Sequence, residues 1–130
     1  MLHVMDASAL LAMMQDEKGG DLVNHLIEEQ ECVASSVNIA EVGARMVDKG
    51  LDPSQLKRTL KELDVQTIDF DLEQALLCSK LRLLTKSAGL SLGDRACLAL
   101  TQLMDGIAVT ADHAWGDVKE ATGVRVLTIR

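Results

Sequence analysis

Short apolar runs separate longer segments in which apolar residues recur every three or four positions. The first run, Leu2 to Met5, ends at Asp6, and a similar apolar run covers residues 107–110. Short apolar runs bounded by polar residues predict buried strands, and the spacing between them predicts amphipathic helices. We expect strands over residues 2–5, 32–34, 65–68, 107–110 and 125–129, the third at a sheet edge because it contains polar residues.

Capping residues and glycines bracket the segments between these runs. Asp21 is suited to cap a helix, Asp52-Pro53 is a typical helix start, and Gly50 and Gly106 follow expected helix ends. We expect helices over residues 7–14, 22–27, 37–49, 53–63, 72–84, 92–105 and 114–121. Strands that alternate with helices predict an α/β domain with a central five-stranded parallel sheet and helices on both faces.

The composition fits a single domain with an aliphatic core. Hydrophobic residues make up 48% of the 130 residues and aromatic residues only 2%, so the core must consist of Leu, Val, Ile, Ala and Met. The net charge of −7 argues against a nucleic-acid binder that relies on bulk positive charge. It does not exclude a nuclease, because clustered carboxylates can hold divalent cations that reverse the local charge.

Cysteine usage and hydropathy predict the compartment. Cys32, Cys78 and Cys97 are odd in number and lack C-x-x-C spacing, which predicts reduced, buried thiols. The first residues include Asp6 and no basic region, so we expect no signal peptide. No apolar run is long enough to span a bilayer, and we therefore expect a cytoplasmic protein without a membrane partner.

Polar residues directly follow three of the predicted strands: Asp6, Ser35-Ser36, and Thr110 to Asp112. Open α/β sheets bind ligands at the carboxyl ends of their strands, so an acid there is expected to face a cation. Simpler explanations stay open for each acid. Asp6 and Asp112 suit helix caps, Glu41 and Arg45 suit a surface ion pair of ~0.3–0.5 kcal/mol, and Ser91 and Asp94 suit a capping box.

Four motifs along the chain resemble those of the PIN domain, specifically the small VapC-type ribonuclease toxins of bacterial toxin–antitoxin pairs. They are VMDASALL at 4–11, VNIAEV at 37–42, GLSLGDR at 89–95 and VTADHAW at 109–115. They occur in the family's order along essentially the whole chain. The resemblance implies one PIN-like nuclease domain over residues 1–130, with a three-layer α/β/α fold around the five-stranded parallel sheet.

The same resemblance implies a set of site residues. Four acids would act in catalysis and hold the metal, two hydroxyls and one further acid would support them, and one arginine is a candidate contact to RNA. The four acids are Asp6, Glu41, Asp94 and Asp112. The supporting residues are Ser8, Thr110 and Asp117, and the arginine is Arg95.

Clustered carboxylates suit the hydrolysis of a phosphodiester bond. This reaction needs an activated water and a neutralised phosphate, and Mg²⁺, for which Mn²⁺ is expected to substitute, supplies both while preferring carboxylate ligands. We expect a metal-dependent endoribonuclease that leaves 5′-phosphate and 3′-hydroxyl ends. Because like charges repel, the empty cluster should have at least one carboxyl group with a raised pKa.

The resemblance also implies partners: RNA as the substrate, a small antitoxin protein as the inhibitor, and a second copy of the chain in a homodimer. Contact with DNA would be indirect, through the antitoxin.

An alternative is a catalytically silent PIN-fold module that binds an antitoxin or RNA without cutting. Three other aspartate-based sites fit poorly. An adhesion-type metal site needs Asp-x-Ser-x-Ser, an aspartyl phosphotransferase usually has Asp-x-Asp, and a receiver domain needs paired acids and a late lysine.

Overall fold

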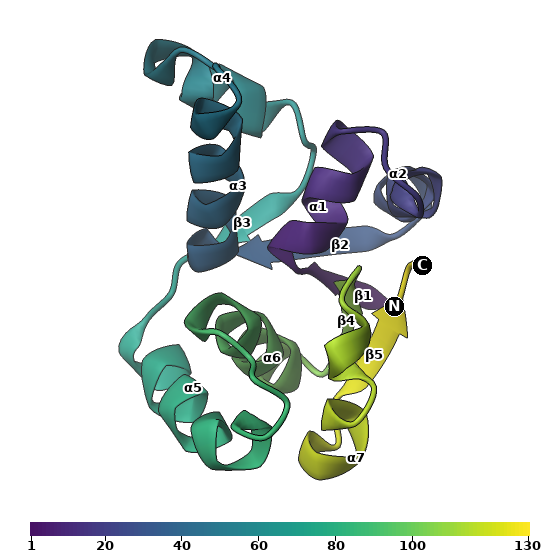
Figure 1. The fold of residues 1–130 in the computed structure, drawn as a ribbon, viewed down its shortest axis with the longest axis vertical. Helices are drawn as coiled ribbons and strands as arrows, with labels where there is room; N and C mark the ends of the chain where they lie inside the picture. The colour runs from purple at the N-terminus through teal and green to yellow at the C-terminus, as the bar shows by residue number, and fades with distance from the viewer.

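A five-stranded parallel sheet forms the centre of the computed structural model, which describes residues 1–130 (Figure 1). Its strand order is β3-β2-β1-β4-β5. The strands are β1 (Leu2–Met5), β2 (Glu31–Ser35), β3 (Gln66–Ile68), β4 (Ile107–Thr110) and β5 (Arg125–Thr128). They lie close to the predicted ranges, and β3 is an edge strand, as its polar residues predict.

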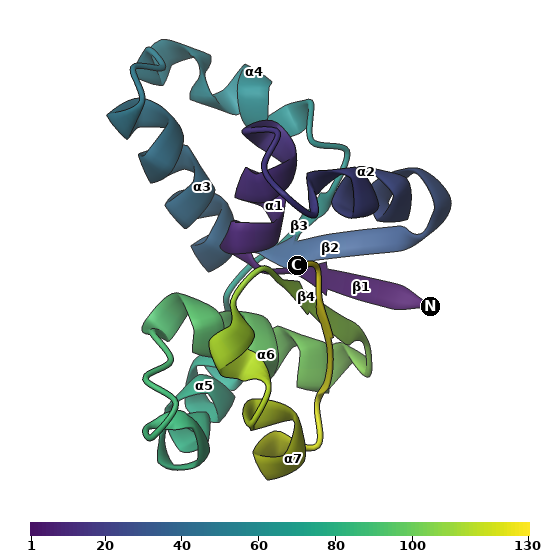
Figure 2. The ribbon, with the colours of Figure 1, turned by 45° about the vertical axis from the view of Figure 1, so that its right-hand side comes forward.

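Helices cover both faces of the sheet (Figure 2). One face carries α1 (Ala7–Met14), α2 (Gly20–Glu29), α3 (Ser36–Asp48) and α4 (Leu56–Lys61), and the other carries α5 (Leu72–Thr85), α6 (Leu92–Met104) and α7 (Val118–Thr122). Short 3-10 helices cover Pro53–Gln55 and His113–Trp115. These three layers confirm the predicted α/β/α fold.

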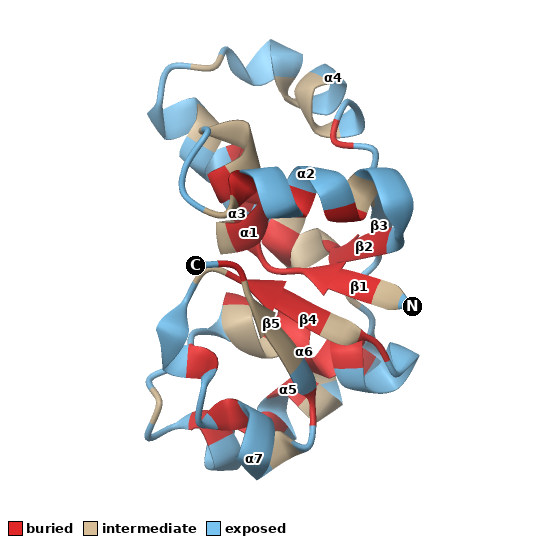
Figure 3. Cartoon of the chain, turned by 90° about the vertical axis from the view of Figure 1, so that its right-hand side faces the viewer, coloured by how far each residue is buried: buried red, intermediate tan, exposed pale blue.

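The alternation of side chains along the central strands builds two aliphatic cores. Val4 of β1 packs with residues of α5 and α6, whereas Met5 packs with residues of α1 and α2 on the opposite face. Both side chains are fully buried, as successive residues of a strand covered on both sides must be. Figure 3 shows β1 and β4 as buried along most of their length. The carboxyl edge of the sheet is therefore held rigidly between two helical layers.

Three local predictions were wrong. The single helix predicted over 53–63 is a 3-10 helix, which Pro53 starts, followed by the short α4. Asp21 does not cap α2, which begins at Gly20 with Gly19 as the N-cap at φ 91°. A Cβ at Gly20 would lie 2.5 Å from the carbonyl oxygen of Ala12, so the close packing of α2 on α1 fixes this start. The helix predicted over 114–121 is instead a 3-10 turn followed by α7, because Trp115 is fully buried and anchors the turn against the core.

The cysteines agree with the prediction from the sequence. All three cysteines are free and buried. No helix has both the length and the apolar character that crossing a bilayer requires.

Candidate active site

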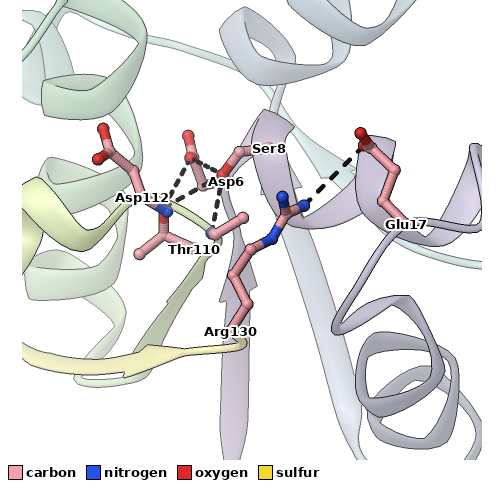
Figure 4. Close-up of polar contacts among 7 residues, drawn as sticks. Asp6, Ser8, Glu17, Thr110, Asp112 and Arg130 are labelled. Carbon is pink, nitrogen blue, oxygen red and sulfur yellow. Dashed lines mark hydrogen bonds and ion pairs between the residues drawn. The ribbon is translucent and has the colours of Figure 1, made fainter.

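Asp6 lies where β1 passes into α1, and its side chain does not cap that helix. The residue is only 4% exposed, and its Oδ2 accepts hydrogen bonds from Ser8 Oγ at 2.7 Å and from Thr110 Oγ1 at 3.0 Å (Figure 4). Capping therefore does not explain this acid. Two hydroxyls from separate elements orient it instead.

The backbone after β4 fixes the direction of both hydroxyl groups. The N–H of Ala111 donates to Ser8 Oγ at 2.9 Å, and the N–H of Asp112 donates to Thr110 Oγ1 at 3.1 Å. A hydroxyl has one proton, so each hydroxyl that accepts from the backbone can direct its own proton at Asp6. Both protons meet at Oδ2 of Asp6, and Oδ1 keeps its lone pairs for another partner.

Glu41 projects from α3 and is held by a buried amide. Its Oε1 accepts a hydrogen bond from Asn38 Nδ2 at 2.8 Å, one helical turn earlier, and the same nitrogen donates to the carbonyl oxygen of Gly93 at 3.0 Å. Asn38 is fully buried. Both of its partners are oxygen atoms, which accept hydrogen bonds, so the amide atom that faces them must be the nitrogen. None of the three ion pairs in the structure joins Glu41 to Arg45, so the surface-pair explanation of Glu41 is not realised.

Gly93 lets the Glu41 carboxylate rest against the first turn of α6. A Cβ at Gly93 would lie 2.2 Å from Oε1 and 2.6 Å from Oε2 of Glu41, distances that no side chain tolerates. The N-terminus of a helix favours a carboxylate because its free N–H groups carry partial positive charge. Asn38 and Gly93 thus place Glu41 beside the residue that follows Gly93, which is Asp94.

Asp94 forms the predicted capping box and still faces the site. Its Oδ2 accepts from the N–H of Ser91 at 2.9 Å, and Ser91 Oγ accepts from the N–H of Asp94 at 3.2 Å. Only one carboxylate oxygen is used in the box. The structural and functional explanations of Asp94 are therefore compatible.

Asp6, Glu41 and Asp94 line one pocket of about 450 Å³. In each acid one carboxylate oxygen is held by a protein donor, while the other accepts no hydrogen bond from the protein. No group of three His, Cys, Asp or Glu side chains is arranged to hold a metal ion as it stands. An oxygen-only set of carboxylates from three separate elements nevertheless fits a hard divalent cation, because mutual repulsion keeps like charges apart until a cation joins them.

The electrostatics of the pocket agree with this repulsion. Burial raises the pKa of Asp6 to about 6, the hydrogen bond from Ser8 opposes the rise, and the negative charges of Asp94 and Glu41 add to it. Burial also raises the pKa of Glu41, against the hydrogen bond from Asn38, and Asp94 contributes in the same direction as burial. Carboxyl groups with raised pKa values are thus present, with burial as the main cause and the repulsion between the clustered acids as a smaller one.

The remaining predicted residues lie outside this pocket. Asp112 is exposed in an adjacent pocket of about 250 Å³, and its Oδ1 accepts from the N–H of Ala114 at 2.9 Å, so it does cap a turn. Asp117 is exposed and precedes α7 without a side-chain capping bond. Arg95 turns toward α5, where its Nη1 donates to the carbonyl oxygen of Cys78 at 3.1 Å.

Several residues that line or shape the site were missed from the sequence: Asn38, Gly93, Arg45, Asp48 and Arg130. The local signals were the spacings of Asn38 and Arg45 from Glu41, three and four residues along one helix.

Comparisons with known proteins agree with this fold. The family model described as the PIN domain matches residues 4–121. No curated protein matches the chain. Similar solved structures include VapBC2 from Rickettsia felis bound to a promoter DNA fragment, with a TM-score of 0.73, 16% identity and 98% of each chain covered. A toxin–antitoxin complex from Klebsiella pneumoniae has a TM-score of 0.72, 20% identity and 98% of each chain covered. FitAcB from Neisseria gonorrhoeae has a TM-score of 0.68 and 16% identity, covering 97% of this chain and 96% of that one. At these identities the likeness shows the fold.

Proposed function

The chain belongs to the PIN domain family, and we propose on this premise that it is a metal-dependent endoribonuclease, the cytoplasmic toxin of a toxin–antitoxin pair. One observation carries the proposal. Three carboxylates at the carboxyl edge of the sheet line one pocket, and each keeps one oxygen free of protein hydrogen bonds. A cluster of like charges destabilises a fold unless a cation binds to it, so the arrangement is explained by a ligand and not by stability.

Asp6, Glu41 and Asp94 would hold Mg²⁺, with Mn²⁺ as a substitute. When bound, such an ion lowers the pKa of water and neutralises a phosphate oxygen. Ser8 and Thr110 orient the Asp6 carboxylate, and Asn38 orients that of Glu41. A carboxylate of the cluster takes the proton from the water that attacks phosphorus in line with the leaving 3′-oxygen. The 2′-hydroxyl takes no part, and the products carry 5′-phosphate and 3′-hydroxyl ends.

Asp112 takes a supporting place in this proposal. It lies in the pocket next to the three acids, and the two pockets share the wall residues Ser8, Leu11 and Arg45. We assign Asp112 to act on the site through an intervening water. Asp117 lies farther along the chain on an exposed turn. We assign it only an indirect role, in the positioning of Asp112.

Partners follow from the structures that this chain resembles and from its own surface. The structures from Klebsiella pneumoniae and Rickettsia felis are described as toxin–antitoxin and VapBC complexes, and we assign this chain a small antitoxin as its inhibitor. Contact with DNA would occur through that antitoxin.

One face of α5 carries three strongly exposed leucines, Leu72, Leu76 and Leu83, the last of them 87% exposed. An apolar helix face of this kind supports a homodimer.

Cleavage of a mixed pool of tRNA and mRNA tests the proposal. The purified chain is incubated with Mg²⁺, with Mn²⁺ and with EDTA, beside Asp6→Asn and the control Asp21→Asn, whose side chain is exposed on α2. Metal-dependent cutting that is lost only in Asp6→Asn supports the nuclease. RNA binding that is equal in Mn²⁺ and EDTA, with no cutting and no Mn²⁺ binding, would replace it with the catalytically silent module.

A further inference from the structure

A single cation lines the acidic pocket, and it is Arg45. The other charged residues of the wall are Asp6, Glu41, Asp48 and Asp94. Arg45 is exposed on α3, and none of the three ion pairs of the structure includes it. An arginine that served to neutralise these acids would be paired with one of them. A free guanidinium at this place is instead available to a ligand.

Arg45 also lines the adjacent pocket, and a second arginine, Arg130, lines it as well. That pocket of about 250 Å³ is bounded by Arg45 and Arg130, together with Glu17 and Asp112. The Arg130 side chain is only 30% exposed and approaches Glu17 Oε1 at 3.9 Å, the outer limit of an ion pair (Figure 4). Its position is thus partly fixed by packing, while most of its N–H donors remain free.

We propose that Arg45 and Arg130 form a phosphate-binding subsite that holds the RNA backbone beside the bond to be cut. The inference rests on the proposed ribonuclease function and adds the residues that carry the substrate strand. Phosphate is the anion that fits, because a guanidinium presents paired N–H donors that match two phosphate oxygens. An RNA strand is favoured over an acidic peptide, because its neighbouring phosphate can face the cation that the adjacent carboxylates are proposed to hold.

The arrangement explains how a chain with a net charge of −7 can bind RNA. The bulk charge repels a polyanion, so attraction must be local. The acids attract a cation that faces the scissile phosphate, and the two arginines supply fixed positive charge for a neighbouring phosphate. Backbone contacts of this kind position the strand without reading its sequence.

Binding of RNA at several salt concentrations tests the subsite. The full chain is titrated into a fluorescein-labelled single-stranded RNA oligonucleotide of mixed sequence in Ca²⁺, with a gel to verify that the RNA stays intact. Arg45→Ala and Arg130→Ala are compared with the control Arg58→Ala, an exposed α4 arginine paired with Glu62 at 3.6 Å. Thermal unfolding verifies that each variant is folded, and Mn²⁺ titration measures the metal site separately.

We expect Arg45→Ala to weaken RNA binding by about tenfold, since a charge-assisted contact is lost. The slope of log affinity against log salt should become shallower by about 0.7 for each phosphate contact removed from a single strand. Arg45→Lys should keep most of the salt slope but not all of the affinity, because an ammonium cannot bind two oxygens in parallel. Arg58→Ala should match the unsubstituted chain.

Three results would overturn the inference, and they differ in what they leave standing. If the unsubstituted chain binds and cuts RNA while Arg45→Ala has the same affinity and salt slope, the subsite is wrong and the nuclease remains. A rise in Mn²⁺ affinity in Arg45→Ala with an unchanged salt slope would likewise assign Arg45 to charge balance alone. If the unsubstituted chain neither binds nor cuts RNA, the proposed function and the subsite both fail.

Discussion

Replacing Gly93 by alanine should separate activity from stability at this site. Gly93 is the second residue of α6, and the new Cβ would lie 2.2 Å from Glu41 Oε1 and 2.5 Å from its Cδ. Ordinary contacts are about 3.5 Å, so the carboxylate has to move by about 1 Å or more. That shift takes Glu41 out of reach of the Asn38 amide, now at 2.8 Å, and away from Asp94.

The expected cost to folding is small, because two effects oppose each other. The lost hydrogen bond to Asn38 destabilises by about 0.5–1.5 kcal/mol. Alanine in a helix is favoured over glycine by roughly 0.5–1 kcal/mol. The net change in the free energy of unfolding should therefore stay within about 1 kcal/mol. Loss of the hydrogen bond that orients a metal ligand commonly costs about 10- to 100-fold in metal affinity or activity, and we expect a loss of at least that size in Mn²⁺ affinity and in kcat/KM.

Three measurements decide this prediction: urea unfolding in EDTA, Mn²⁺ titration, and kcat/KM on a cleaved RNA. Gly43→Ala is the matched control, because it is the same change in helix α3 and its Cβ would meet Leu56 Cδ2 at an ordinary 3.5 Å. The control should keep full activity. Wild-type kcat/KM in a folded Gly93→Ala variant would refute the assignment of Glu41 to the catalytic pocket.

Further predictions concern the same three acids and the groups that hold them. Asn38→Ala should lower activity by about 10- to 100-fold. It should also lower the free energy of unfolding, measured in urea, by about 1–3 kcal/mol, because it leaves the buried carbonyl of Gly93 without its partner. Unchanged values for both would contradict the role of Asn38. The pKa of Asp6 is raised from 3.8 to about 6, so the folded state binds more protons than the unfolded state between these values. The metal-free chain should therefore lose up to about 3 kcal/mol of stability as pH rises from about 4 to about 7. Asp6→Asn should remove most of that slope in denaturant titrations and leave only the smaller part that comes from Glu41, whose pKa is also raised. Mn²⁺ at about 100 times its Kd should raise stability by about 2.7 kcal/mol and the Tm accordingly, with a much smaller rise in Asp94→Asn. Ser8→Ala removes a hydrogen bond that lowers the pKa of Asp6, so the acidic limb of the pH–activity profile should move to higher pH; an unmoved limb would exclude Asp6 as the group that limits activity in acid.

Local sequence patterns determined the elements and the types of residue at the sheet edge. Four mostly apolar residues before Asp6 specify a buried strand, because a strand covered on both faces needs apolar side chains in both directions. Ser91 and Asp94 specify the start of α6, because the capping box joins groups only three residues apart. These interactions act within a few residues, and sequence alone is sufficient to predict them.

Only the tertiary structure decided how these residues meet. Asp6 is oriented by Thr110, 104 residues away, and Asn38 joins Glu41 to Gly93 across 55 residues. Arg45 and Arg130 come to one pocket from α3 and the segment after β5. Such contacts depend on the strand order and on the distance at which helices pack on the sheet. Neither leaves a local pattern in the chain, because each is set by the packing of the two cores as a whole.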